Sequence, residues 1–297
     1  MPKIAIIVLH FGDKKNTLEC LTSIEKSTYP KKQLAVFIVD NGTGNLSENE
    51  LRSKSFLSKL VKLDYNSGFS KGVNAGIKTA LKDPLIKYIF LLNNDIVLTA
   101  NSFKYIATEL ESKNIDIAGG IITYYDDREK IWFAGGSLNE IFCFTKHLYM
   151  NKHLTSNIEL PNADFITGAA MFIRRQVFEK IGFFDEDYFL YWEDVDFCQR
   201  AKRFKHKISC LNTIVGHHKV SSSSGLTGSN KLSPVRAYYF ARNPFLFMKK
   251  NNLPILTGLI GQLFIRLPYY FFSQTGLSSF YQYLKGLWDG LKFLYLH

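Results

Sequence analysis

The sequence of 297 residues has few cysteines, and they are not spaced as zinc ligands or as a redox pair. Cys20, Cys143, Cys198 and Cys210 lie far apart, without a C-x-x-C motif. The opening residues, MPKIAIIVLHFG, also lack the small-residue cleavage site of a signal peptide. We therefore expect reduced thiols in a cytoplasmic protein, and we interpret the first apolar run as a β-strand.

The last part of the chain has almost no acidic residues and no long apolar run. From Arg236 to His297 there are seven Lys or Arg residues, one acid (Asp289) and 16 of the 44 aromatic residues. The two uncharged runs, 251–265 and 267–284, are too short or too rich in Ser, Thr and Gln for a membrane-spanning helix of about 20 apolar residues. The aromatic residues cluster with Leu and Ile rather than with Arg and Lys, which argues against a nucleic-acid partner.

A basic, aromatic and helical segment of this kind is typical of proteins that lie on an anionic membrane surface. We predict a globular domain at 1–235 and a helical C-terminal region at 236–297. The C-terminal region would hold the protein at the inner face of the cell membrane as a peripheral anchor. The alternative is that this region packs on the domain and leaves its basic side chains in solvent.

The first hundred residues alternate between strand and helix signals. Continuous apolar runs at 4–11, 34–41 and 88–92 are separated by segments with helical periodicity. Strands that are apolar on both faces are typical of parallel sheets covered by helices. The sequence therefore predicts an α/β fold with a mostly parallel central sheet flanked by helices.

The apolar segment YIFLLNNDIVLT, residues 88–99, is interrupted by the polar triplet Asn93, Asn94 and Asp95. Such a triplet forms a turn when its side chains bond to the backbone. It can also bind a metal or a nucleotide, because open α/β sheets bind ligands at the carboxyl ends of parallel strands. The triplet alone leaves both interpretations open.

The segment DYNSGFSKGVNAG, residues 64–76, has Gly68, Gly72 and Gly76 at intervals of four. Glycines near a helix start let backbone N–H groups approach a phosphate. The segment matches neither the Walker pattern nor G-x-G-x-x-G. Close packing of a helix would explain the glycines equally well, without any ligand.

Three carboxylates, Glu193, Asp194 and Asp196, follow a cluster of aromatic residues in DYFLYWEDVDF. At a solvated helix start, the helix dipole alone would favour them. Among aromatic rings, burial would raise the pKa of a carboxyl group and suit it to act as a general base. Farther on, His217 and His218 could be surface residues, or they could join carboxylate and amide oxygens around Mn²⁺ or Mg²⁺.

Seven segments occur in an order that resembles the family 2 glycosyltransferases with the GT-A fold, especially their rhamnosyltransferase-like branch. They are VDNG, NSGFSKGVNAG, LLNND, AGG, ITGAAMFIRRQVFEKIGFFDE, YFLYWEDVDFCQR and HHKVSSSSG. The resemblance covers about residues 3–250. Two features depart from the family: Asn93 stands in place of an acid, and the first strand ends at His10 and Phe11 where relatives commonly have Asn.

The resemblance implies a metal-dependent, inverting hexosyltransferase in cell-surface polysaccharide or glycolipid synthesis. It would move a sugar, rhamnose-like as a first assignment, from a dTDP- or UDP-sugar to a hydroxyl of a lipid-linked or glycan acceptor. Asp194 would be the general base, with Trp192 and Glu193 on the acceptor side. Two alternatives stay open: a carbohydrate-binding or scaffold protein of the same fold without turnover, and a nucleotidyltransferase.

The resemblance also implies a donor site. Asp95, Asn93 and His218 would hold Mn²⁺ or Mg²⁺ on the donor diphosphate. The residues along the donor would be Asp40 at the pyrimidine base, then Asn66, Gly68, Lys71, Asn74, Asn94, Asp95 and Gly168. Close packing against the sheet is the alternative explanation for Gly168.

Overall fold

The computed structural model describes residues 1–52, 56–155, 158–219, 233–272 and 276–296. Its first half alternates strands and helices in the predicted order: β1 (Lys3–His10), α1 (Lys14–Glu25), η1 (Lys31–Gln33), β2 (Leu34–Asn41), α2 (Glu48–Arg52), β3 (Leu57–Leu63), α3 (Gly68–Ala80) and β4 (Ile86–Asn93). Strands β3, β2, β1 and β4 are neighbours in this order, and all three pairings are parallel. Their carboxyl ends therefore meet at one edge of the sheet.

The second half of the domain completes the sheet with strands of both directions. Its elements are β5 (Ile96–Leu98), α4 (Ser102–Ser112), β6 (Ile117–Tyr124), β7 (Ile131–Phe133), β8 (Gly136–Asn139), β9 (Phe144–His147), β10 (Ala170–Arg174), α5 (Arg175–Ile181), α6 (Glu193–Arg203) and β11 (Ile208–His218). Strand β10 is antiparallel to β4 and β6, β11 is parallel to β6, and β5 is antiparallel to β11. The α/β fold with a mostly parallel sheet flanked by helices is confirmed: β6 and β11 run in the direction of the first four strands, and β10, β5 and β7 run against it.

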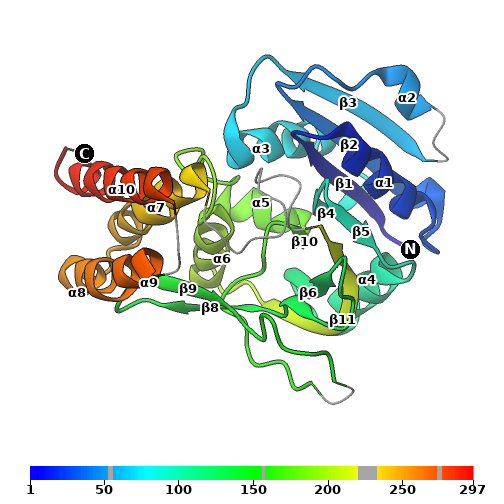
Figure 1. Ribbon diagram of the computed structural model, residues 1–297. Coiled ribbons are helices and arrows are strands. Elements are labelled where there is room, and N and C mark those ends of the chain that lie inside the picture. The colour runs from blue at the N-terminus through cyan, green and yellow to red at the C-terminus, as the bar shows by residue number, and fades with distance from the viewer. Residues whose placement is uncertain (53–55, 156–157, 220–232, 273–275, 297) are drawn as a thin grey trace.

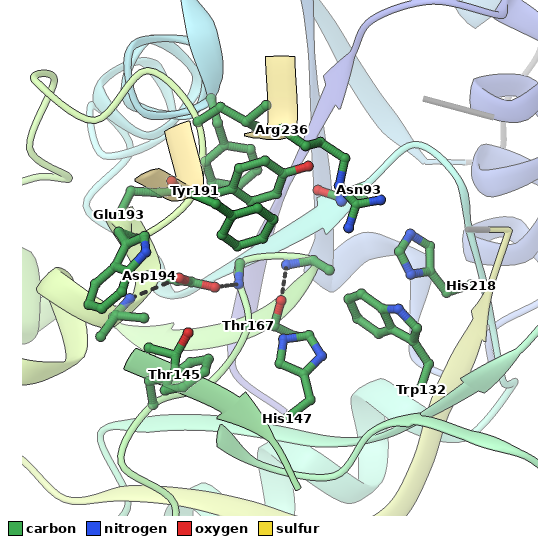
Figure 2. Close-up of a pocket in the computed structure, with 18 residues that line it drawn as sticks. Asn93, Trp132, Thr145, His147, Thr167, Tyr191, Glu193, Asp194, His218 and Arg236 are labelled. Carbon is green, nitrogen blue, oxygen red and sulfur yellow. Dashed lines mark hydrogen bonds between the residues drawn. The ribbon is translucent and has the colours of Figure 1, made fainter. Parts of the chain in front are cut away.

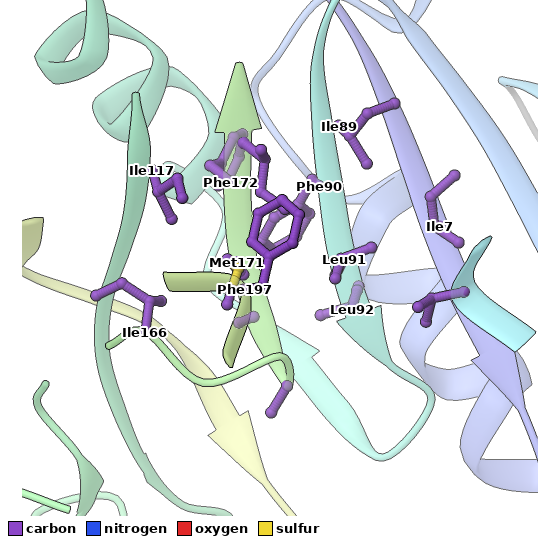
Figure 3. Packing of buried hydrophobic residues seen from close by; sticks show 14 of the residues in the cluster. Ile7, Ile89, Phe90, Leu91, Leu92, Ile117, Ile166, Met171, Phe172 and Phe197 are labelled. Carbon is purple, nitrogen blue, oxygen red and sulfur yellow. The ribbon is translucent and has the colours of Figure 1, made fainter. Parts of the chain in front are cut away.

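The core lies where β4 and β10 pair (Figure 3). Phe90 and Phe172 are in register and their rings stack at 4.2 Å, while Phe103 of α4 meets Phe90 edge-on at 5.3 Å. All three are fully buried, and aromatic pairs contribute about 0.5–1.5 kcal/mol each beyond their buried area. This cluster fixes β4, whose end carries the polar triplet. The four cysteines are buried as free thiols.

Two glycines bring α3 close to the sheet. A Cβ atom at Gly72 would lie 2.5 Å from a methyl of Leu9, and one at Gly76 would lie 2.6 Å from a methyl of Ile7. Close packing therefore explains Gly72 and Gly76. Gly68 differs, because it begins α3 with a φ of 83°, which glycine adopts without strain.

The C-terminal helices gather at the end of the molecule that lies away from β3 and α2 (Figure 1). They are α7 (Pro234–Asn251), α8 (Ile255–Ile260), the π-helix η2 (Gly261–Arg266), α9 (Leu267–Phe272) and α10 (Leu277–Leu296). Helix α7 packs against α10 and buries Phe245, Leu246 and Phe247 in the same core as the sheet. Packing on the domain thus applies to α7. No helix in the described ranges is both long and apolar enough to cross a bilayer.

Candidate active site

Two adjoining pockets lie at the edge of the sheet where β4 ends. The Asp194 pocket is lined by Asp194, Glu193, Trp132, His147 and His218, among others (Figure 2). The Asn66 pocket is lined by Phe11, Asn41, Asn66, Gly68 and Asn94, among others. Five residues line both pockets and form their shared border: Phe69, Asn93, Leu190, Tyr191 and Arg236.

A left-handed turn before α6 presents Asp194 to its pocket. Tyr191 and Trp192 have φ angles of 67° and 74°, which cost of order 1–3 kcal/mol each and persist only where the surroundings impose them. Asn243 of α7 is fully buried, and its Nδ2 donates hydrogen bonds to the carbonyls of Leu190 at 2.9 Å and Tyr191 at 2.8 Å. The C-terminal helix therefore holds the turn in place.

The Asp194 carboxylate accepts hydrogen bonds from the backbone N–H of Gly168 at 3.0 Å and of Val195 at 2.8 Å. Burial raises the pKa of Asp194 to about 6, although these hydrogen bonds oppose the shift. Gly168 is also tightly packed, because a Cβ there would lie 2.9 Å from the Phe69 ring. Asp194 is thus charged at neutral pH and is a stronger proton acceptor than an exposed aspartate, as a general base requires.

The two neighbouring acids differ from Asp194. Glu193 is buried, and its Oε2 has no hydrogen-bond partner among the described residues. Burial, and then the charge of Asp194, raise the pKa of Glu193 well above its usual range, so Glu193 is protonated while Asp194 is charged. Asp196 forms an ion pair with Arg200 at 2.8 Å and lines neither pocket.

The polar triplet after β4 has two different surroundings. The Nδ2 of Asn94 donates hydrogen bonds to Thr17 Oγ1 at 2.9 Å and to the Phe11 carbonyl at 3.3 Å. Asp95 is 2% exposed, and its Oδ1 lies 3.2 Å from Nε2 of His218. The backbone does turn at Asn94 and Asp95, but the Asn94 side chain bonds Phe11 and Thr17 and not its own backbone, whereas Asp95 lies beside an imidazole.

Strand β11 carries His218 to this place, because it pairs with β5 and sets His218 opposite Ile96. Trp132 packs edge-on against the His218 ring, with 4.2 Å between ring centroids. His217 points elsewhere and shares a hydrogen bond of 2.7 Å with Thr123 Oγ1. Of the two histidines, His218 is the one that lines the Asp194 pocket.

Asp95, His218 and Asn93 offer carboxylate, imidazole and amide donors, which suit Mn²⁺ or Mg²⁺. The Nδ1 of His218 is buried without a hydrogen-bond partner in the described ranges, and Asn93 lines both pockets. Within the same ranges, no three His, Cys, Asp or Glu side chains group into a complete metal site. The residues fit an ion that takes one carboxylate from the protein and completes its shell with phosphate oxygens and water.

Three predicted donor residues, Asn66, Gly68 and Asn94, lie at the Asn66 pocket. Asn41 holds the first two, because its Nδ2 donates hydrogen bonds to Asn66 Oδ1 and to the Gly68 carbonyl, both at 3.1 Å. Asn41 was not among the predicted site residues, although it directly follows Asp40 in the motif VDNG.

Other predicted donor residues lie outside the two pockets. Lys71 is exposed and lines neither. The amide of Asn74 bonds the backbone of Phe184 through both its nitrogen, at 2.8 Å, and its oxygen, at 3.1 Å, and so joins α3 to the segment before α6. Asp40 is buried at the end of β2, where Oδ1 accepts from the Thr43 N–H at 2.9 Å. The Oδ2 of Asp40 has no hydrogen-bond partner among the residues described.

His10, which ends the first strand where relatives commonly have Asn, lines neither pocket. It is fully buried, and its ring nitrogens lie 2.6 Å from Thr17 Oγ1 and 2.6 Å from Asn45 Oδ1. Phe11 does line the Asn66 pocket. The end of the first strand thus presents the phenyl ring of Phe11 to a ligand in the Asn66 pocket, and not the imidazole of His10.

Sequence reasoning missed several residues of the Asp194 pocket. His147 lies at the end of β9, where burial lowers its pKa to about 4 and keeps it neutral, and Trp132 meets it edge-on at 5.0 Å. Arg236 comes from the first turn of α7. Strands β7 and β9 have three and four residues, too few for a periodicity that would mark these side chains.

Comparison with known sequences supports the family that the order of the motifs indicated. The sequence model of the family described as "Glycosyl transferase family 2" matches residues 5–182. The dTDP-rhamnosyl transferase RfbF of Shigella flexneri is 26% identical over 260 residues, which cover 86% of this chain and 82% of that protein. The low-salt glycan biosynthesis hexosyltransferase Agl10 of Haloferax volcanii is 28% identical over 172 residues, 57% of this chain and 54% of that protein.

Solved structures share the arrangement of the whole chain. TarS 1–349 of S. aureus superposes with a TM-score of 0.61 at 18% identity, covering 99% of this chain and 81% of that structure. The mannosyltransferase PcManGT from Pyrobaculum calidifontis, in complex with GDP-Man and Mn²⁺, gives 0.58 at 13% identity, with 98% and 72% covered. At such identities the likeness shows the fold. With the family match, it establishes that the chain belongs to glycosyl transferase family 2 and has the GT-A fold.

Proposed function

We propose that the protein is an inverting glycosyltransferase in which Asp194 is the general base. The observation that carries this proposal is the position of the Asp194 carboxylate, in a pocket that adjoins the Asn66 pocket through a shared border. A nucleotide in the Asn66 pocket would extend its sugar across that border toward Asp194. An acceptor hydroxyl would enter from the side of Trp192 and Glu193.

In the proposed reaction, Asp194 accepts the proton of the acceptor hydroxyl while the hydroxyl oxygen bonds to the anomeric carbon. The bond from that carbon to the diphosphate oxygen breaks on the opposite face, and its electron pair leaves with the nucleoside diphosphate. A single displacement needs one base, unlike retaining glycosidases, which use two carboxyl groups. Protonation of Glu193 supports this role, because the buried pair then carries one negative charge.

The donor is proposed to be a dTDP- or UDP-sugar, with a rhamnose-like sugar as the first candidate. The relative RfbF is named a dTDP-rhamnosyl transferase, and TarS 1–349 has been solved in complex with UDP-GlcNAc. The unpartnered Oδ2 of Asp40 would accept the ring N–H of uracil or thymine if the base extends beyond the Asn66 pocket to the end of β2, with Asn66 and Gly68 next along the nucleotide.

Asp95 and His218, with Asn93, would hold Mn²⁺ or Mg²⁺ beside the Asp194 pocket, which His218 and Asn93 line. When bound, such an ion neutralises negative charge on the leaving diphosphate. The PcManGT complex contains Mn²⁺, which supports an ion in this family member as well.

Thermal shift with a panel of nucleotide-sugars tests the donor, because a ligand that binds only the native state raises its apparent stability. The stabilising donor is then incubated with acceptor, with and without Mn²⁺, and released nucleoside diphosphate is measured. A binding or scaffold protein would be stabilised without releasing product. A nucleotidyltransferase would instead release pyrophosphate from a nucleoside triphosphate and a sugar phosphate.

The acceptor is proposed to be lipid-linked or an exposed glycan, reached by an enzyme that lies on an anionic membrane surface. Helices α8 and α9 and the π-helix between them expose Leu256 to 73%, Phe264 to 73% and Phe271 to 60%. These apolar side chains and the excess of Lys and Arg after residue 235 have the chemistry of an interfacial helix. Since α7 joins this face to Arg236 at the pocket border, the face lies on the same unit as the site.

Vesicle co-sedimentation tests the membrane face. Leu256→Glu combined with Phe264→Glu should abolish binding to vesicles of phosphatidylglycerol and phosphatidylcholine. Leu85→Glu is the matched control, because Leu85 is 72% exposed but lies just before β4. Binding of the unaltered protein should weaken with added salt. Equal binding of both variants would contradict the proposed face.

A further inference from the structure

One guanidinium stands at the border between the two pockets. Arg236, in the first turn of α7, lines both pockets, together with Asn93 and Tyr191. In Figure 2 its side chain extends past Tyr191 toward Asn93, at the end of β4. The border is therefore built from the sheet edge on one side and the C-terminal helix on the other.

Arg236 is the only Lys or Arg among the lining residues of either pocket in the described part of the chain. Lys71, which the sequence placed near the phosphates, is exposed and lines neither pocket. On the proposed function, a donor whose base lies in the Asn66 pocket and whose sugar lies in the Asp194 pocket crosses this border with its diphosphate. That bridge is doubly negative, so it needs cationic groups where it crosses.

The surroundings of Arg236 hold its side chain but do not neutralise it. Its guanidinium carbon lies 5.8 Å from the ring centroid of Tyr191 and 6.0 Å from that of Phe240. Its Nε is buried without a hydrogen-bond partner among the described residues, and no carboxylate of these residues pairs with it. Burying an unpaired guanidinium donor is costly, and a phosphate oxygen would remove that cost.

We infer that Arg236 binds the diphosphate of the donor and stabilises the nucleoside diphosphate as it leaves. It would donate hydrogen bonds to phosphate oxygens, and because arginine does not lose its proton, its charge stays in place as the bond to the sugar breaks. This assigns part of donor binding to the C-terminal region. It also compensates for Asn93, which contributes an amide where an acid would allow a more strongly held cation.

Calorimetric titration of the full chain tests this inference with UDP and dTDP, and with uridine and thymidine as probes without phosphate. Arg236→Gln should weaken diphosphate binding at least about tenfold, the loss expected for one charge-assisted hydrogen bond, both with EDTA and with Mn²⁺. Nucleoside affinity should change less than about twofold. Arg236→Lys keeps the charge without the planar fork, and should retain part of the affinity.

Lys285→Gln is the control, because it removes one exposed positive charge from the same helical region. It should leave all four affinities unchanged. Equal losses for nucleosides and diphosphates in Arg236→Gln, or no loss of diphosphate affinity in a folded Arg236→Gln, would overturn the inference while the proposed function stands. If the unaltered protein bound neither diphosphate, the proposed function would fail first, and the inference with it.

Discussion

Two acidic sites lie near the end of β4, and they differ in what surrounds the carboxyl groups. Asp95 lies 3.2 Å from the imidazole of His218, an arrangement that offers a negative oxygen beside a second metal donor. Asp194 has two backbone N–H donors and a protonated neighbour, Glu193, and burial raises its pKa to about 6. The first surroundings favour holding a cation, and the second favour taking a proton. The two aspartates thus differ in proposed function because their surroundings differ.

The largest effect is expected from the proton-accepting site. Asp194→Asn should lower the transfer rate at least about a hundredfold, because an amide cannot take the hydroxyl proton. Affinity for UDP or dTDP should change little, since the nucleotide lies in the other pocket. Steady-state transfer and calorimetric titration measure the two quantities, with the exposed Asp126→Asn as control. Near-normal turnover of Asp194→Asn would place the base elsewhere.

The cation-holding site should show the opposite behaviour. Asp95→Ala and His218→Ala should each weaken donor binding in the presence of Mn²⁺ by about tenfold or more, within the range known for weakened metal sites. Without metal, nucleoside affinity should be unchanged. Electron paramagnetic resonance of Mn²⁺, titrated with UDP present, measures the loss directly. Titrations of both variants that match the unaltered protein would remove these residues from the cation site.

The pH dependence of sugar transfer should also distinguish the Asp194 site from the Asp95 site. The base must be unprotonated, so kcat/KM should rise about tenfold per pH unit at low pH and level off above the pKa of about 6 of Asp194. The residual activity of Asp194→Asn should lack this rising limb. Asp95→Ala should keep it, because the limb belongs to the other site. A plateau that begins near pH 4 in the unaltered protein would contradict a buried base.

The smallest effect concerns stability. Burial raises the folded-state pKa of Glu193, so the folded state holds this proton more tightly than the unfolded state, and stability falls as pH rises above the ordinary value of 4.5. Glu193→Gln removes that cost. At pH 7 its Tm should be higher than that of the unaltered protein by a few °C. Below pH 4 the difference should vanish, and an equal difference at both pH values would refute this origin.

Much of the fold follows from local sequence pattern. The continuous apolar runs predict β1, β2 and β4, because strands that are buried on both faces consist almost entirely of apolar residues. The antiparallel course of β10 has no such signal, since its direction depends on how a long connection returns to the sheet. The hydrophobic periodicity of the sequence therefore could not predict the strand directions in the second half of the sheet.

Some residues of the candidate site could likewise be predicted from the sequence, and others could not. Motif order predicted Asp194, Asp95 and His218, and the structure brings them to one edge of the sheet. Asn74 shows where this reasoning stops: its position in the glycine-rich segment suggested a nucleotide, but its amide bonds Phe184, 110 residues away in the chain. Arg236 escaped prediction for a related reason, because only the packing of α7 brings it to the border.

The late position of α7 in the sequence affects how the enzyme is made. Ribosomes build chains from the N-terminus, and N-terminal parts tend to fold first. The sheet can thus bury its core while Asn243 and Arg236 are still to be made, but the turn at Tyr191 then lacks its support. A nascent chain should remain inactive until α7 has docked. Activity would therefore begin as the helices that carry the proposed membrane face are being completed.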